Sequence, residues 1–286
     1  MTVLEVIQRS TEFLARKGLD SARLQAELLL AHVLKLPRMQ LYLNFERVLT
    51  PADLDHYREL IKRRGQREPL QHIVGSTSFC GLELAVSRQV LVPRPETELL
   101  AERAWTFLNQ LPASGVQSPC ALDFGTGSGC LAIALAVKCP LARIDAIDLS
   151  NDALAVAREN AARHGAADRI RFLQGDGFAA VPPGSEFDLL VSNPPYIPTS
   201  EIATLEPEVR DYDPPQALDG GPDGLDFYRR LATEAAPRLK PAGKLMLEFG
   251  DGQSGRIEEI LKNQKWVVDE VVNDYTQRPR ILIARR

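Results

Sequence analysis

The chain has 286 residues, of which 44% are hydrophobic and 25% are charged, and its formal net charge is −4. This length can hold one large domain or two smaller ones, and the composition is typical of a globular protein. The small negative charge argues against broad electrostatic attraction to nucleic acid or to an anionic membrane, because both depend on an excess of Lys and Arg.

Helical periodicity dominates the start of the chain. A first helix is predicted to end at Gly18, and Asp20 is expected to cap a second helix that ends before Pro37. A third helix should begin at Thr50-Pro51, a capping residue followed by the residue favoured at the first helical position. Helices this short are marginal alone, so we expect them to pack as a small bundle.

A β-hairpin is predicted to follow the helices. Two short β-like runs, STSF and LELAV, meet at Cys80-Gly81. We therefore divide the chain into a helical domain over residues 1–68, a hairpin linker over residues 69–92 and a second domain over residues 93–286.

The second domain alternates strand-like and helix-like segments, with helices expected near residues 96–111, 224–239 and 255–263. Near-continuous apolar strands that alternate with amphipathic helices indicate a mostly parallel sheet covered on both faces. The last two strand-like runs, WVVDEVV and RILIARR, follow one another without a helix and should pair antiparallel at an edge. The predicted fold class is therefore α/β with a doubly wound sheet.

No apolar stretch approaches 18 residues, and the N-terminus lacks the features of a signal peptide. We therefore expect a cytoplasmic protein that does not enter a membrane. The spacing of Cys80, Cys120, Cys130 and Cys139 matches neither a zinc site nor a redox pair, so reduced thiols and no metal site are expected.

A glycine-rich loop follows the first strand of the second domain. It reads DFGTGSG over residues 123–129, and the third glycine of a dinucleotide fingerprint would fall at position 130, which is Cys130. Alternating glycines allow a tight turn and a close approach of backbone to ligand just before a helix. The G-x-G-x-G spacing after an acid resembles the loop of class I S-adenosylmethionine-dependent methyltransferases.

Asp148 ends the next strand, where a carboxylate can accept both hydroxyls of a ribose. The alternative is a solvated aspartate that caps the following helix. Beyond the third strand, Gly175-Asp176-Gly177 occupies the place where the methyltransferase class contacts the adenine. The resemblance further implies that ligands bind between the first and fourth strands, where strand order reverses.

The fourth strand-like run is followed by Asn193, Pro194, Pro195 and Tyr196. Two consecutive prolines fix the backbone and remove two N–H donors, so the carbonyl oxygens of Asn193 and Pro194 are held as acceptors. Asn193 adds a side-chain carbonyl, and Tyr196 adds an aromatic face. This set suits a planar –NH2 group; the alternative is a proline-stiffened loop without a function.

Longer segments narrow the resemblance. Residues 69–98 read PLQHIVGSTSFCGLELAVSRQVLVPRPETE, residues 211–231 read DYDPPQALDGGPDGLDFYRRL, and LEFGDGQ follows later. They resemble the peptide chain release factor glutamine N5-methyltransferases, the PrmC/HemK family, whose fold is a helical domain joined by a hairpin to a class I methyltransferase domain. The chain departs from that pattern at Gly177, often aromatic in relatives, and at Gln277, where a glycine is common.

The resemblance implies methyl transfer from S-adenosylmethionine to the side-chain nitrogen of the glutamine in the GGQ motif of class I release factors. It implies a monomer that meets its protein partner without nucleic acid or membrane. Asn193, Pro194 and Tyr196 would be catalytic, and together with Pro195 they would hold the glutamine. The residues implied to hold the cofactor are Gly125, Thr126, Gly127, Ser128, Gly129, Asp148, Asp176, Gly177 and Asn193.

Other readings of the same motifs stay open. An NPPY motif also fits enzymes that methylate a glutamine of ribosomal protein L3 or an exocyclic amine of a DNA base. The L3 enzyme differs in sequence where this chain has PRPETE. The acidic net charge and the lack of a long basic, aromatic-rich insertion argue against a DNA substrate. A non-catalytic module that binds the methyl donor or RNA is a further alternative.

Overall fold

The computed structural model describes all residues from Met1 to Arg286, which form two compact units. The first unit contains Met1–Gly75 together with Glu206–Tyr212, and the second contains Ser76–Leu205 and Asp213–Arg286. The model has no helix that is both long and apolar enough to cross a membrane.

The first unit is a bundle of helices around one apolar core. The side chains of Leu14, Leu29 and Tyr57 are fully buried there, and the Tyr57 hydroxyl donates to the carbonyl of Ala26 at 3.1 Å. Its helices are α1 (Val3–Arg16), α2 (Ala22–Leu34), α3 (Arg38–Tyr42), α4 (Pro51–Gly65), α5 (Leu70–Val74) and α9 (Pro207–Arg210).

The two predicted helix caps have different outcomes. The prediction for α4 is confirmed, since the side chain of Thr50 accepts from the amide of Asp53 and Pro51 is the first helical residue. The cap at Asp20 is wrong. Helix α2 begins after Ser21, which has φ +49° and makes no side-chain capping bond, so the left-handed residue at the turn sets the start of this helix.

Two arginines of the helical unit bind a segment that is distant in sequence. Nη2 of Arg64 donates to Glu208 at 2.8 Å, and Nη2 of Arg67 lies 2.7 Å from Glu206. Arg64 is buried. Burial lowers the pKa of its guanidinium, because the charged form is less stable away from water. The segment from Glu206 to Tyr212 is therefore part of this unit through paired charges, and nothing in the local sequence predicts it.

The predicted hairpin is confirmed. Strands β1 (Ser76–Phe79) and β2 (Leu82–Ala85) pair antiparallel, with Phe79 opposite Leu82. Cys80 and Gly81 have φ angles of +51° and +78°, as a two-residue turn that matches the strand twist requires. The amide of Cys80 donates to Glu98 Oε1 at 2.7 Å, which fastens the turn to helix α6.

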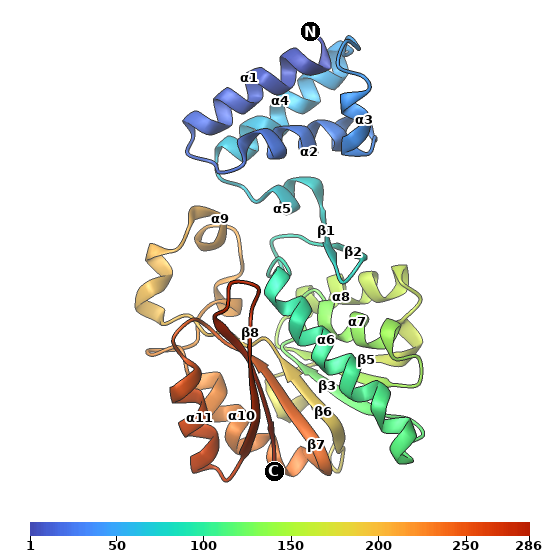
Figure 1. Ribbon diagram of the computed structural model, residues 1–286, viewed down its shortest axis with the longest axis vertical. Coiled ribbons are helices and arrows are strands. Elements are labelled where there is room, and N and C mark those ends of the chain that lie inside the picture. Colours follow the sequence, from blue (N-terminus) through green and yellow to red (C-terminus); the bar gives the residue numbers. More distant parts are fainter. The chain divides into compact units, whose positions relative to one another are not determined.

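The second unit has a seven-stranded sheet in the order β5-β4-β3-β6-β7-β9-β8 (Figure 1). All neighbouring strands pair parallel except β9, which is antiparallel to both β7 and β8, so the predicted antiparallel edge is confirmed. The strands are β3 (Cys120–Phe124), β4 (Arg143–Asp148), β5 (Ile170–Gln174), β6 (Phe187–Ser192), β7 (Leu239–Glu248), β8 (Val267–Asn273) and β9 (Pro279–Arg285).

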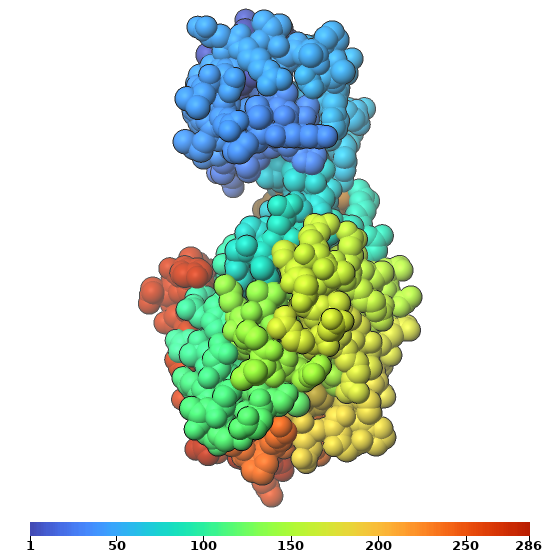
Figure 2. Space-filling model, turned by 90° about the vertical axis from the view of Figure 1, so that its right-hand side faces the viewer, coloured from blue at the N-terminus to red at the C-terminus, as the bar shows by residue number.

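Helices cover both faces of this sheet. One apolar core lies between the sheet and helices α6, α7 and α8, and the other lies between the sheet and helices α10 and α11. Figure 2 shows the green to yellow-green part of the chain, which includes α6 and α8, on the surface of this unit. The helices are α6 (Pro95–Gln110), α7 (Cys130–Lys138), α8 (Asn151–Arg163), α10 (Asp226–Glu234) and α11 (Ser254–Asn263).

Helix α10 is shorter than predicted. It ends at Glu234 and not near residue 239, because a 3-10 turn that contains Pro237 follows and Leu239 already pairs with Phe187 in the sheet. Gln277, noted as a departure in sequence, has φ +66° in the turn between β8 and β9. A glycine adopts this left-handed conformation without strain, whereas a glutamine does so less readily.

The paired charges of the helical unit give a stability prediction. Glu208→Ala should lower the unfolding free energy of this unit by about 2 kcal/mol, because it leaves a buried donor of the Arg64 guanidinium without its carboxylate. Hydrogen exchange of the amides of α4 measures the loss. Glu201→Ala, which removes an exposed glutamate side chain, is the control, and equal protection of α4 in both variants would contradict the prediction.

Candidate active site

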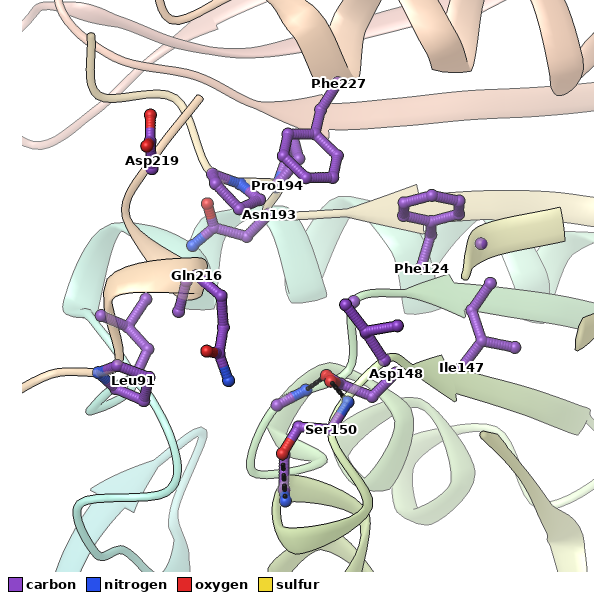
Figure 3. Close-up of a pocket in the computed structure, with 18 of the residues that line it drawn as sticks. Leu91, Phe124, Ile147, Asp148, Ser150, Asn193, Pro194, Gln216, Asp219 and Phe227 are labelled. Carbon is purple, nitrogen blue, oxygen red and sulfur yellow. Dashed lines mark hydrogen bonds between the residues drawn. The ribbon is translucent and has the colours of Figure 1, made fainter. Parts of the chain in front are cut away.

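A cavity of about 550 Å³ opens in the second unit at the carboxyl ends of β3, β4, β5 and β6. Loops from each of these strands line it, as Figure 3 shows for the side chains of Phe124, Asp148 and Asn193. Strand β3 pairs with both β4 and β6, so strand order reverses there. The glycine loop and the NPPY segment therefore meet at one cavity, as the sequence predicts.

The glycine loop is held by hydrogen bonds to Asp123 at its start, to strand β4 and to helix α7. Oδ2 of Asp123 accepts from Thr126 Oγ1 at 2.6 Å and from the amide of Ala132 at 3.1 Å, while the amides of Gly125 and Thr126 donate to the carbonyl of Ile147. Burial raises the pKa of Asp123 to about 7. The loop shape therefore depends on a buried carboxyl that binds both the turn and the first helical residues of α7.

The three glycines of the loop have different surroundings. Gly125 and Gly127 line the cavity with φ +76° and +54°, and a Cβ on either would meet nothing within 4 Å. A Cβ on Gly129 would lie 2.9 Å from Ile133 Cδ1 and 3.1 Å from Ala157 Cβ. Gly125 and Gly127 thus leave room beside the backbone for a ligand, whereas Gly129 allows helices α7 and α8 to pack closely.

Asp148 lies at the cavity wall with its carboxylate held in place. Oδ2 accepts from the amide of Gly127 at 2.8 Å and Oδ1 accepts from the amide of Ser150 at 2.9 Å (Figure 3). Ser150 caps α8 by accepting from Ala153, so the alternative of Asp148 as the helix cap is wrong. Each carboxylate oxygen keeps a second acceptor site. Asp148 is therefore positioned to accept hydroxyl groups from the cavity.

The loop after β5 contributes Asp176 and Gly177. Asp176 is exposed and paired with Arg230, whose Nη2 also donates to the Asp176 carbonyl at 3.0 Å. The guanidinium of Arg230 lies 5.9 Å from the ring centre of Phe124, and a Cβ on Gly177 would meet Arg230 Nη2 at 2.7 Å. Position 177 therefore offers no ring, and the aromatic surfaces of the cavity come from Phe124 and Phe227.

Asn193, Pro194 and Pro195 line the cavity directly after β6. Asn193 is half-buried, and its Nδ2 donates to Thr97 Oγ1 at 3.1 Å. One of the two hydrogens of the side-chain nitrogen is thereby bonded, and Oδ1 is the acceptor of this carboxamide. Tyr196 does not line the cavity. It packs against the apolar core beneath α10, and burial raises the pKa of its phenol to about 12.

The structure separates the predicted site residues into two groups. Those that line the cavity are Gly125, Gly127, Asp148, Asp176, Gly177, Asn193, Pro194 and Pro195. Those outside its lining are Thr126, Ser128, Gly129 and Tyr196. Thr126 and Ser128 are buried and shape the loop from behind.

Sequence reasoning missed several residues of the cavity wall, among them Phe124, Phe227 and residues of two further segments, one before PRPETE and one inside DYDPPQALDGG. The first supplies Gln89, Val90 and Leu91, and the second supplies Pro214, Gln216, Ala217, Asp219 and Gly221. In sequence, both segments resemble a family but carry no signal of their own for a cavity. The clustering of Pro, Asp and Gly in the second is a signal for a tight turn but does not indicate its place in the fold.

These features fit a methyl donor that carries a ribose and an adenine. The fit consists of a loop that lines the cavity with the glycines Gly125 and Gly127, a fixed carboxylate with spare acceptor sites, and the rings of Phe124 and Phe227. Asn193 and Pro194 add acceptor oxygens on the side of β6. The cavity can therefore hold such a donor beside a group that donates hydrogen bonds.

Solved structures share this fold. A methyltransferase from Pyrococcus furiosus matches with a TM-score of 0.50 and 20% identity, over 73% of this chain and 90% of that chain. The N-terminal domain of human METTL16 in complex with SAH matches with a TM-score of 0.50 and 17% identity, over 72% of this chain and 76% of that chain. The fold of this chain is therefore that of these solved methyltransferases.

The sequence comparisons identify the family. Residues 5–75 match the PrmC N-terminal domain, and residues 103–205 match the methyltransferase small domain. The release factor glutamine methyltransferase of Geobacter sulfurreducens is 46% identical over 88% of this chain and 86% of its own length. That of Chlorobaculum tepidum is 44% identical over 98% and 95%. The chain belongs to the release factor glutamine methyltransferase family, whose methyl donor is S-adenosylmethionine.

The glycine loop gives a matched pair of variants. Gly129→Ala should lower the unfolding free energy by about 2–3 kcal/mol, since its Cβ collides with α8 and L-residues are strained at this φ. Gly127→Ala should cost only about 1 kcal/mol but weaken donor binding at least about tenfold, because its Cβ enters the cavity. Thermal unfolding and calorimetric titration with S-adenosylhomocysteine measure the two effects. The reverse order of effects would contradict the assignment.

Proposed function

We propose that this protein transfers a methyl group from S-adenosylmethionine to the side-chain nitrogen, N5, of the glutamine in the GGQ motif of class I peptide chain release factors. One observation carries the proposal. The NPPY acceptors and the glycine loop line the same cavity, in a chain that is 46% identical to a release factor glutamine methyltransferase.

The chain's own residues would act mainly by positioning. A carboxamide nitrogen is a poor nucleophile because its lone pair is delocalised into the carbonyl. Oδ1 of Asn193 and the carbonyl oxygen of Pro194 would accept its two hydrogens, fix its orientation and favour its pyramidal form. Pro195 would keep both acceptors rigid. Positioning of this kind can contribute roughly 7–11 kcal/mol in well-oriented systems.

The bound donor would supply an electrophilic methyl group. Gly125, Gly127 and Asp148 would hold its methionine and ribose parts, with Thr126, Ser128 and Gly129 shaping the loop. Asp176 and Gly177 would lie at the adenine. No general base is needed before transfer, since the proton can leave once the nitrogen is positively charged. Tyr196 would support the site through its backbone, because its carbonyl accepts from Gln253 at 2.9 Å.

We assign substrate recognition to residues 1–68, with residues 69–92 as the linking hairpin and residues 93–286 as the methyltransferase domain. A glutamine at a loop tip offers too few contacts for selectivity by itself. Met39, Leu43 and Val48 of the helical unit are exposed by 66%, 84% and 69%, and a protein partner can bury such apolar side chains. The release factor would be bound without nucleic acid, by a cytoplasmic monomer.

The first prediction concerns the acceptor. Asn193→Ala should lower turnover by about 100-fold or more, because the substrate nitrogen loses an orienting oxygen. Affinity for S-adenosylhomocysteine should change little. Turnover is measured with radiolabelled donor and purified release factor. Turnover comparable to that of the unaltered enzyme would remove this mechanism.

A second prediction concerns the helical domain. Deletion of residues 1–68 should reduce methylation of intact release factor far more than it reduces donor affinity. Calorimetric titration with S-adenosylhomocysteine gives the affinity, and labelled donor gives the activity. Equal losses of both would argue that the helical domain is purely structural.

The substrate itself is tested by mapping. The enzyme is incubated with labelled donor and, separately, with a class I release factor, ribosomal protein L3 and DNA. The proposal expects label in the release factor, with the extra methyl group on the glutamine of the GGQ motif by mass spectrometry. Label on L3 or DNA alone would assign the enzyme to one of the alternative substrates.

A further inference from the structure

A buried chain of hydrogen bonds ends at Asn193. Thr97 Oγ1 donates to Glu248 Oε2 at 2.7 Å, and Asn193 Nδ2 donates to Thr97 Oγ1 at 3.1 Å. Thr97 and Glu248 are only 2% and 1% exposed. Thr97 belongs to PRPETE and Glu248 to LEFGDGQ, so two motifs separated by 151 positions meet behind the NPPY segment.

The hydrogen bonds that join Asn193, Thr97 and Glu248 can run in only one direction while Glu248 is ionised. A carboxylate accepts hydrogen bonds and cannot donate them, so it takes the single proton of the Thr97 hydroxyl. The hydroxyl oxygen can then only accept, and of the two ends of the Asn193 carboxamide only the nitrogen can donate to it. The oxygen of Asn193 is thereby left for the cavity, whose wall Asn193 forms between Pro194 and Gln216 in Figure 3.

We infer that Thr97 and Glu248 are positioning residues that fix the orientation of the Asn193 carboxamide, so that its oxygen rather than its nitrogen meets the substrate. The inference rests on the proposed function, in which the substrate presents an –NH2 group. If the Asn193 carboxamide were turned by half a rotation, its NH2 group would face the –NH2 group of the substrate. Two donors cannot form a hydrogen bond, so the substrate would not be held.

The other end of NPPY is held from the same motif. Nε2 of Gln253 donates to the carbonyl of Tyr196 at 2.9 Å, and its Oε1 accepts from the amide of Gly250 at 2.9 Å. A Cβ on Gly250 would lie 2.9 Å from the ring of Tyr196. LEFGDGQ therefore supports the NPPY segment at its last residue and, through Glu248 and Thr97, at its first.

The direction of the chain depends on the charge of Glu248. Burial raises the pKa of this carboxyl to about 7. Below that pH the neutral carboxyl can donate to Thr97, whose own proton is then free for the oxygen of Asn193. Turnover should therefore be full above pH 7 and fall as the pH decreases through this value. The charged and titratable groups around Glu248 are Arg94, Glu96, Arg280, Tyr196 and Tyr228.

Three variants test the inference by kinetics. Thr97→Val keeps the shape but removes the hydroxyl, and Glu248→Gln replaces the pure acceptor by a group that also donates. Each should lower kcat for release factor methylation about tenfold, because a buried hydrogen bond is lost or loses its direction. KM for the release factor and the affinity for S-adenosylhomocysteine should stay within about twofold. Thr97→Ser keeps the hydroxyl, so its kcat should equal that of the unaltered enzyme. In Glu248→Gln, turnover should no longer fall as the pH decreases through 7.

A measurement without turnover separates this inference from the proposed function. The side-chain NH2 signals of Asn193, assigned by their absence in Asn193→Ala, should shift with pH around 7 in the unaltered protein by heteronuclear NMR. They should not shift in Glu248→Gln. If Thr97→Val fails to fold, this titration and the Glu248→Gln kinetics decide the question.

The possible results are distinct. If the unaltered enzyme methylates no release factor, the proposed function is refuted. The NMR titration needs no turnover and would still test the orientation of the Asn193 carboxamide. Unchanged kcat in Thr97→Val, an acidic fall that persists in Glu248→Gln, or NH2 signals that ignore pH would each overturn it.

Discussion

The parallel pairing of β3 with β6 is the constraint on which the site depends. Ala121 lies opposite Leu189 and Asp123 opposite Val191, so the loops that follow these strands leave the sheet side by side. One loop has no side chains toward the cavity at Gly125 and Gly127, and the other presents fixed oxygens. The glycine loop and the NPPY segment are thereby adjacent at one cavity.

Buried carboxyls maintain this arrangement. Asp123 binds the glycine loop from below, and Glu248 binds the NPPY segment through Thr97. Burial raises the pKa of each to about 7, which shows how strongly the apolar surroundings oppose their charge. Donors from the residues around the cavity form hydrogen bonds with each carboxyl and offset the cost of its burial. The burial of these carboxyls therefore depends on the positions of the same residues that shape the cavity.

Much of this structure follows from local sequence. Alternating strands and helices predict the sheet, Cys80-Gly81 predicts the hairpin turn, and Thr50-Pro51 predicts the start of α4. The start of α2 was mispredicted because a left-handed Ser21, and not a side-chain cap, sets it. The binding of Glu208 to Arg64 and the bond between Thr97 and Glu248 join residues more than 140 positions apart, and no local pattern encodes such partners. The ring of Tyr196 packs against the apolar core and does not line the cavity, and the motif alone does not indicate this packing.

The central claim is that two oxygens at the start of NPPY hold a glutamine amide at the mouth of the donor cavity. A crystal structure of the enzyme with S-adenosylhomocysteine and a release factor tests it most directly. We predict that the glutamine nitrogen lies within hydrogen-bonding distance of Asn193 Oδ1 and the Pro194 carbonyl oxygen, with its free side toward the sulfur atom. A glutamine bound elsewhere, or an Asn193 oxygen turned toward Thr97, would contradict the account.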